Sequence, residues 1–204
     1  MNKAATVLKQ EAEAVLPPHL RLVAVAREMF CRDGIHATGI DRILSASGVS
    51  KMTLYTRFGS KEMLVREVLR QEGADWRTSF FAAVLRASPE PQERLRRVIV
   101  ALEPWFRGDR FYGCAFMNAV AEHSKGETWL RKLALEHQAE VIGFLTERAV
   151  EAGFDEPGVL ARQIMLVIDG AIAAYLVSGN AAVLSVSGRT LAAILAQATR
   201  RDDG

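Results

Sequence analysis

Residues 40–58 read IDRILSASGVSKMTLYTRF, and this stretch decides the fold. Its apolar residues recur at helical spacing up to Leu44, pause at a small polar turn around Gly48, and resume at Leu54. Glycine permits a tight turn, and the hydroxyl of Ser50 suits the first cap of a helix. The stretch therefore predicts two short helices joined by a turn, with the second helix running from about residue 51 to residue 57.

The sequence on both sides of this stretch also shows helical spacing. Residues 22, 25, 26, 29 and 30 are apolar, which predicts a helix that starts near Pro17 and Pro18 and ends at Gly34. Thr38 is placed to cap the next helix with its hydroxyl. Further helices are expected over residues 61–87, 92–106, 114–123, 128–152, 157–178 and 187–198. Because the sequence shows no strand pattern, the predicted fold class is all-α with about nine helices.

The composition is that of a globular chain of 204 residues, of which 50% are hydrophobic and 25% charged. Cys31 and Cys114 are too few for a disulfide framework and lack metal-ligand spacing, so no metal or cofactor is expected. The apolar run from Ile164 to Val177 is shorter than the roughly 20 residues of a membrane span. The amino terminus does not resemble a secretory signal. We therefore expect a cytoplasmic protein with no membrane partner.

The charge is unevenly distributed along the chain. The net charge is only +2, yet residues 1–70 hold 11 basic and 7 acidic side chains, so the remainder is slightly acidic. Within residues 50–61, Lys51, Arg57 and Lys61 stand without any acidic residue. Such a basic segment is either a phosphate-facing surface or an ordinary solvated helix face, and charge alone does not decide between them.

Residues with catalytic chemistry form no familiar arrangement in the sequence. It contains no glycine-rich phosphate loop, no serine nucleophile elbow and no activated-cysteine motif. Glu122, His123 and His137 lack the spacing of metal ligands on one helix face. The chain is therefore not expected to be an enzyme.

Two short helices joined by a turn are typical of the helix-turn-helix, whose second helix lies in the major groove of DNA. A purely structural helical hairpin fits much of the same pattern. Three segments favour the first interpretation: Thr38, then residues 48–55 (GVSKMTLY), then residues 58–62 (FGSKE) with Leu64. Together these segments resemble the signature of TetR-family transcriptional regulators.

The resemblance implies that the chain has two domains. Residues 16–66 would form a three-helix DNA-binding domain, and residues 67–200 a helical domain for ligand binding and dimerisation. Residues 113–119 (GCAFMNA) are also similar to a segment in the second domain of some family members. The implied partners are a double-stranded DNA operator, a second copy of the chain, and a small-molecule effector of unknown identity.

The resemblance also implies which residues touch DNA. Thr38 would approach a phosphate through its hydroxyl or backbone, and Tyr55 and Lys61 would bind phosphates. Met52 stands where the family commonly has a small residue, and it either touches a thymine methyl or covers the groove wall. The full set of expected DNA contacts is Thr38, Ser50, Lys51, Met52, Thr53, Tyr55, Thr56, Arg57 and Lys61.

Two further sites are expected in the second domain. The dimer interface, formed in this family by the last two helices, would contain Ile164, Ile168, Ala171, Ile172, Tyr175, Leu191 and Leu195. A buried core explains this apolar stripe equally well. The effector pocket would combine apolar and polar residues, although aromatic residues at helical spacing also occur in an ordinary core. The pocket candidates are Trp105, Phe106, Phe111, Cys114, Met117, Asn118, His137, Phe144, Met165 and Asp169.

These expectations add up to a ligand-responsive regulator of transcription. In the main hypothesis it is a repressor that leaves a pseudo-palindromic operator when a small molecule enters the second domain. One alternative is an activator or a regulator that depends on a co-repressor. Another is a helical ligand-binding protein or enzyme whose helix-turn-helix is inert. The sequence identifies neither the effector nor the operator.

Overall fold

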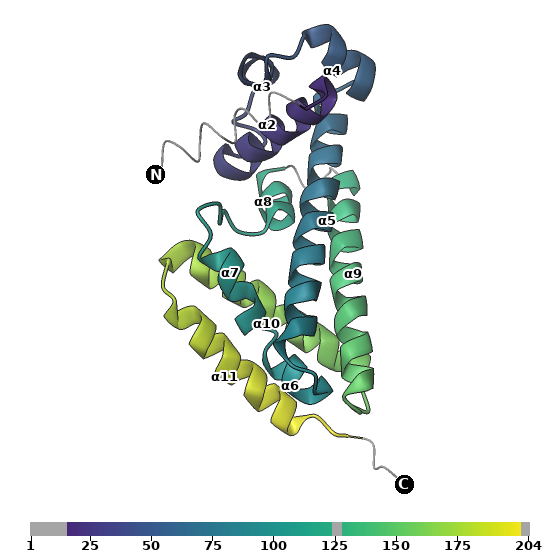
Figure 1. The fold of residues 1–204 in the computed structure, drawn as a ribbon, viewed down its shortest axis with the longest axis vertical. Coiled ribbons are helices and arrows are strands. Elements are labelled where there is room, and N and C mark those ends of the chain that lie inside the picture. Colours follow the sequence, from purple (N-terminus) through teal and green to yellow (C-terminus); the bar gives the residue numbers. More distant parts are fainter. Residues whose placement is uncertain (1–15, 124–127, 201–204) are drawn as a thin grey trace. The chain divides into compact units, whose positions relative to one another are not determined.

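The computed structural model describes residues 16–123 and 128–200 and is helical throughout (Figure 1). Its elements are α2 (Pro18–Asp33), α3 (Ile40–Ser47), α4 (Lys51–Phe58), α5 (Lys61–Ala87), α6 (Pro91–Arg96), the 3-10 helix η1 (Val100–Leu102), α7 (Glu103–Phe106), α8 (Ala115–Glu122), α9 (Thr128–Glu151), α10 (Pro157–Ser178) and α11 (Ala182–Gln197). The described residues form no strand, apart from an isolated bridge between Phe154 and Arg200. The all-α prediction is confirmed, with ten α-helices in this part of the chain.

Two helices differ from their predicted bounds. The helix expected over residues 92–106 is broken, because Val98 donates its N–H to Leu95 at 3.2 Å, a 3-10 contact that tightens the chain into η1. The last helix begins at residue 182 instead of 187. Asn180, just before the N-cap Ala181, favours this early start, since its Oδ1 accepts the otherwise unpaired backbone N–H of Ala182 at 2.9 Å.

The chain divides into two compact units, which are described separately. The first unit contains α2, α3, α4, α5 up to Gly73, α8, and α9 up to Leu133. In its core, Leu22 and Ala26 of α2 are fully buried, as are Ile43 of α3 and Leu54 of α4. The predicted boundary after residue 66 places α8 and the start of α9 in the other domain. In the structure they belong to the unit that carries the helix-turn-helix, and Glu122 of α8 contacts the loop between α2 and α3.

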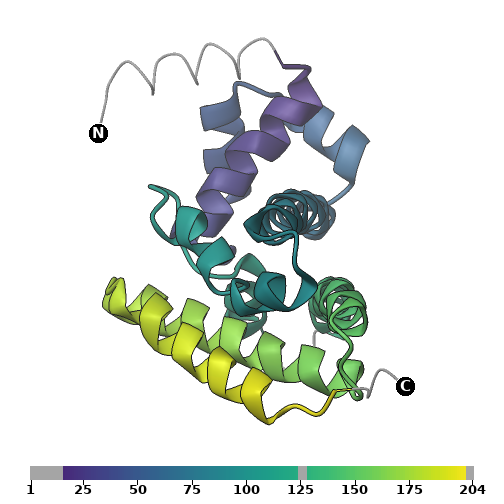
Figure 2. The same cartoon turned by 60° about the horizontal axis from the view of Figure 1, so that its bottom comes forward.

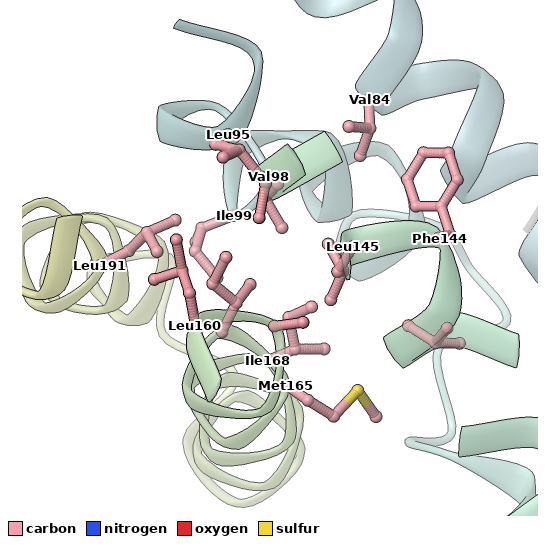
Figure 3. Close-up of a cluster of buried hydrophobic side chains, with 14 of the residues drawn as sticks. Val84, Leu95, Val98, Ile99, Phe144, Leu145, Leu160, Met165, Ile168 and Leu191 are labelled. Carbon is pink, nitrogen blue, oxygen red and sulfur yellow. The ribbon is translucent and has the colours of Figure 1, made fainter. Parts of the chain in front are cut away.

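The second unit contains the remainder of α5 and α9 together with α6, η1, α7, α10 and α11. Helices α10 and α11 run side by side (Figures 1 and 2). The close-up in Figure 3 shows Leu160 and Ile168 of α10 and Leu191 of α11 lying among apolar side chains of the neighbouring helices. These side chains include Val98, Ile99 and Leu145, all of which are fully buried.

Helix α10 is longer than the apolar run from Ile164 to Val177. Its 22 residues are long and apolar enough to cross a membrane by length and composition, with a mean hydropathy of 1.6 over the best 18 residues. A core helix of a globular unit passes the same test. Because Leu160, Ile164 and Ile168 of α10 are buried in the second unit, packing within the chain accounts for the apolar character of the inner side of α10.

Candidate nucleic-acid interface

The turn between α3 and α4 depends on two residues. Gly48 ends α3 with φ 63° and ψ 23°, a left-handed conformation that favours glycine. Ser50 caps α4, because its side-chain oxygen accepts the backbone N–H of Thr53 at 3.1 Å. Ile43 of α3 and Leu54 of α4 anchor the two helices in the core of the first unit. This arrangement is the helix-turn-helix that the sequence predicts.

Helix α4 presents most of the predicted DNA contacts to solvent. Leu54 faces the core. Of the predicted DNA contacts on α4 and its cap, Thr53 is half-buried, and the exposed ones are Ser50, Lys51, Met52, Tyr55, Thr56 and Arg57. A helix face with basic, hydroxyl and apolar groups suits both phosphates and base edges. The structure therefore gathers seven of the nine predicted residues on α4 and its cap.

Lys51 has an ionic neighbour on this surface. Its Nζ lies 3.9 Å from Oδ1 of Asp41, at the start of α3, and both side chains are exposed. Exposed ion pairs contribute about 0–1 kcal/mol to stability. A DNA phosphate can therefore replace Asp41 as the partner of Lys51 at little cost.

Thr38 differs from its prediction. It is fully buried, and its hydroxyl donates to the carbonyl of Gly34 at 2.7 Å. The cap of α3 is Gly39, which makes no side-chain hydrogen bond. The expected cap is therefore wrong, and a phosphate contact through the Thr38 hydroxyl is not supported. The local pattern fits a cap, but α3 starts one residue later than that pattern indicates, and the Thr38 hydroxyl lies against the carbonyl of Gly34.

Lys61 is also engaged inside the chain. Its Nζ donates to the carbonyl of Ile35 at 2.7 Å. Burial lowers the pKa of Lys61, while the carboxylate of Glu122 acts in the opposite direction. An ammonium group has three donors, so the predicted phosphate contact has to share this group with Ile35 and stays a prediction.

Arg21 supports the turn and was missed by sequence reasoning. Its Nε donates to the carbonyl of Ser47, the last residue of α3, at 2.7 Å. A cation at that position satisfies a carbonyl that the helix end leaves unpaired. Nearby, Arg42 lies 2.8 Å from Asp33, and hydrogen bonding from Arg32 is the main reason why the pKa of Asp33 falls to about 2. No local pattern relates Arg21 to Ser47 or Arg42 to Asp33.

The end of α8 holds the loop between α2 and α3. Oε2 of Glu122 accepts the backbone N–H of His36 at 3.0 Å. The same carboxylate lies against Gly34, where an added Cβ would come within 3.0 Å of both oxygens. The rings of His36 and His123 lie 4.4 Å apart. Glu122 and His123 are thus part of the unit that carries the helix-turn-helix.

Comparison with known proteins finds matches centred on this same region. Residues 22–68 match the family model of bacterial regulatory proteins of the tetR family. The HTH-type transcriptional activator FasR of Mycolicibacterium smegmatis is 36% identical over 89 residues, or 44% of this chain. The HTH-type transcriptional repressor KstR2 of the same species is 34% identical over 80 residues, or 39% of this chain. The chain spans only 40% and 38% of the length of these two relatives.

Solved structures match far more of the chain. A TetR-family transcriptional regulator from Streptomyces coelicolor has a TM-score of 0.80 at 29% identity, over 91% of this chain and 95% of its own. A putative regulator of the same type from Streptomyces avermitilis has a TM-score of 0.77 at 26% identity, over 91% and 100%. The chain belongs to the TetR family. This is a family of regulatory proteins, not of enzymes.

Several predicted pocket residues of this TetR-family protein form an aromatic cluster in the second unit. The rings of Trp105, Phe106 and Phe111 lie 4.9–5.7 Å apart. Tyr175 of α10 stacks on Phe106 at 4.5 Å, and Cys114 packs against the same core.

Two other pocket candidates lie in the first unit. Met117 and Asn118 belong to α8, which is part of the unit that carries the helix-turn-helix. Asn118 lines a cavity of about 10 Å³ beside Cys31 and Glu122, which is enough for one water at most. The structure does not bring this pair together with the aromatic cluster inside one unit.

His137 is the most perturbed of the polar candidates. It is buried, and its Nδ1 lies 2.8 Å from a guanidinium nitrogen of Arg77. Burial, with a smaller effect from the charge of Arg77, lowers the pKa of His137 to about 4. The ring is therefore neutral near pH 7, and its Nδ1 accepts a hydrogen bond from Arg77. Arg77 also pairs with Glu140 at 2.9 Å, and the ring of Trp76 lies 5.6 Å from that of His137.

The remaining pocket candidates have mixed surroundings. Phe144 stacks on Phe81 at 4.0 Å, and Met165 is buried in the core shown in Figure 3. Asp169 of α10 is half-buried, and burial raises its pKa to about 6. Two larger pockets of the described residues, of about 270 and 280 Å³, contain none of the ten candidates. The effector site stays a prediction.

The predicted dimer residues face the core of their own chain. The buried members are Ile164, Ile168, Ala171, Ile172, Leu191 and Leu195, and Tyr175 is half-buried against Phe106. A side chain that is already packed inside its own unit offers no surface to a partner. We therefore correct the predicted interface: helical spacing identifies residues that share a face, but a core stripe and an interface stripe have the same spacing.

Proposed function

We propose that this protein is a transcriptional repressor that binds operator DNA through α4. The observation that carries the proposal is the construction of α4. Ser50 caps its start, Leu54 anchors its inner side, and its outer side presents the groups that meet phosphates and base edges. The family match over residues 22–68 covers the same helix, and the relative KstR2 is named as a repressor.

Fluorescence anisotropy tests DNA binding directly. The full chain is titrated into duplexes from the promoter beside its own gene at several salt concentrations, and binding should weaken as salt rises. Lys51→Ala removes one exposed charge from each α4 and should reduce the steepness of the logarithmic salt dependence by about 0.9 for each α4 helix bound to DNA. Lys132→Ala removes an exposed charge from α9 and should leave the slope unchanged. Binding that does not depend on salt would contradict the proposal.

We propose that two copies of the protein form a homodimer through the outward face of α10 and α11, and that this dimer binds DNA. On α10, Leu166 is 72% exposed and Val177 is 89% exposed, and on α11 Val186 is also largely exposed. Val159, Leu166 and Ala173 follow one another at intervals of seven residues on the exposed side of α10. An apolar stripe of this kind fits the same stripe on a second copy. Two copies would place two α4 helices on adjacent half-sites.

We propose that a small-molecule effector binds in the second unit and lowers operator affinity. The aromatic cluster around Phe106 offers apolar area, and the pair of Arg77 and His137 offers polar groups that orient a ligand. An effector can release DNA only if it binds the DNA-free arrangement more tightly than the DNA-bound one. Ligand-dependent loss of anisotropy with the operator duplex tests this part, and a set of aromatic acids provides the first probes because Arg77 is cationic.

A second candidate function is activation, which differs in outcome but not in the DNA-binding step. FasR, which is 36% identical over the matched region, is named as an activator. A reporter gene under the protein's own promoter separates the two roles. Deletion of the gene for this protein should raise reporter expression if the protein represses the promoter, and lower it if the protein activates the promoter. Because α4 acts on chromosomal DNA in either case, we place the protein in the cytoplasm.

A further inference from the structure

The first turn of α4 presents an unusual set of side chains to a DNA base. In a helix-turn-helix, the amino-terminal residues of the second helix contact base edges. Here those residues are Lys51, Met52 and Thr53, preceded by the cap Ser50. Met52 is 79% exposed, so the core of the first unit does not need its side chain.

The hydroxyl groups beside Met52 already have partners. The Oγ atoms of Ser50 and Thr53 lie 2.9 Å apart, and one donates to the other. The Ser50 oxygen also accepts the backbone N–H of Thr53. Their shared bond uses one of the two hydroxyl protons and helps to fix both side chains. Lys51, the remaining polar neighbour, is a flexible point charge that suits a phosphate.

Met52 is therefore an exposed apolar side chain among polar neighbours. Leu54 is buried and Phe58 is half-buried, while the exposed Tyr55 ends in a hydroxyl. A thioether has no N–H or O–H to donate and is only a weak acceptor. Placed against polar base edges, it would displace their water without replacing the lost hydrogen bonds.

The major groove offers one apolar feature, the 5-methyl group of thymine. A methionine side chain is unbranched and polarisable, so it adapts its shape to such a small group. We propose that Met52 recognises a thymine methyl group in each half-site of the operator. The inference rests on the proposed function, because it requires α4 to lie in the major groove.

Removal of a single methyl group from the DNA tests the proposal. The full chain first selects duplexes from a random-sequence library, and each thymine of the enriched site is then replaced by deoxyuridine, which keeps every hydrogen bond of the base pair. Burial of one methyl group corresponds to about fourfold in affinity. We expect this fourfold loss of affinity when one particular thymine in a half-site is replaced. Replacement of the equivalent thymines in both half-sites should lower the affinity about fifteenfold.

Two variants assign the effect to a side chain. Met52→Ala should bind more weakly and should lose its sensitivity to deoxyuridine at that position. Met63→Ala is the matched control, since Met63 is a partly exposed methionine on α5, and it should keep the full sensitivity. Circular dichroism should show both variants folded, because neither side chain is buried.

The outcomes separate this inference from the proposed function. If the library yields no enriched sequence and binding ignores salt, the protein is not an operator-binding regulator. If a sequence is enriched but no thymine is sensitive to deoxyuridine, DNA binding stands and the role of Met52 is overturned. It is equally overturned if Met52→Ala keeps the sensitivity of the unaltered chain.

Discussion

Substitution of Gly34 by alanine places a methyl group in a space that is already occupied. Gly34 ends α2 with φ 89° and ψ 155°, and its N–H donates to the carbonyl of Phe30. The new Cβ would lie 3.0 Å from both carboxylate oxygens of Glu122 and 3.2 Å from its carboxyl carbon. Gly34→Ala therefore strains the backbone and also pushes Glu122 away from the loop.

The two effects can be estimated separately. That backbone region is essentially restricted to glycine, and another residue there costs about 1–3 kcal/mol. A displaced Glu122 loses its hydrogen bond to the backbone N–H of His36, and for a half-buried carboxylate we take about 1 kcal/mol. The sum is about 3 kcal/mol of unfolding free energy for the first unit, or roughly 12–24 °C in its melting temperature.

Hydrogen exchange followed by mass spectrometry resolves the effect by segment, so it distinguishes the first unit from the second. Faster exchange is expected in α2, α3 and α8. Gly39→Ala is the matched control, because Gly39 has φ −77° and nothing within 4 Å of its added Cβ. In a Glu122→Ala background the cost of Gly34→Ala should fall to the backbone part alone. A cost of Gly34→Ala no greater than that of Gly39→Ala would refute both the strain at Gly34 and its contact with Glu122.

Three further predictions concern the second unit and the turn. Leu166→Glu should convert a dimer to monomers in sedimentation velocity, whereas Leu135→Glu, at a residue of α9 that is 64% exposed, should not. Asp169 has its pKa raised to about 6 and His137 has its pKa lowered to about 4. Between pH 4 and 6 the first group lowers stability as pH rises and the second increases it. Asp169→Asn should therefore increase stability at pH 7 by about 1–2 kcal/mol after allowance for screening. In urea titrations at several pH values, the free energy of unfolding of this variant should fall more steeply towards acid pH than that of the parent. Equal slopes against pH would contradict the raised pKa of Asp169. Arg21→Gln should lower stability by about 1 kcal/mol in the same titrations, because the carbonyl of Ser47 loses a charged donor.

The sequence predicts the helix-turn-helix well because its determinants are local. The conformation of Gly48 and the cap of Ser50 each depend on residues within four positions, and both appear in the structure. Thr38 was wrongly predicted as the cap of α3, because that helix is capped by Gly39 and the Thr38 hydroxyl donates to the carbonyl of Gly34. The contacts of Arg21 and Lys61 join residues 26 positions apart, and no local pattern indicates such a pair.

The second unit shows a different limit of sequence reasoning. Spacing correctly grouped Ile164, Ile168 and Leu191 on apolar faces, but those faces point into the chain. Helix α10 carries apolar residues on both its inner and its outer side, including Leu166 and Val177. With two apolar sides, periodicity cannot tell which one belongs to the core. That choice is made by long-range packing against α9 and α11.

The membership of α8 in the first unit has a consequence for protein engineering. Phe116 and Ala119 of α8 are buried within that unit, so a fragment that stopped at residue 73 would leave their apolar partners in water. The backbone passes between the two units three times, after residues 73, 114 and 133. Exchange of DNA-binding heads between such regulators therefore requires α8 to be transplanted with the amino-terminal helices, and a chimera with a single junction near residue 66 should be poorly soluble.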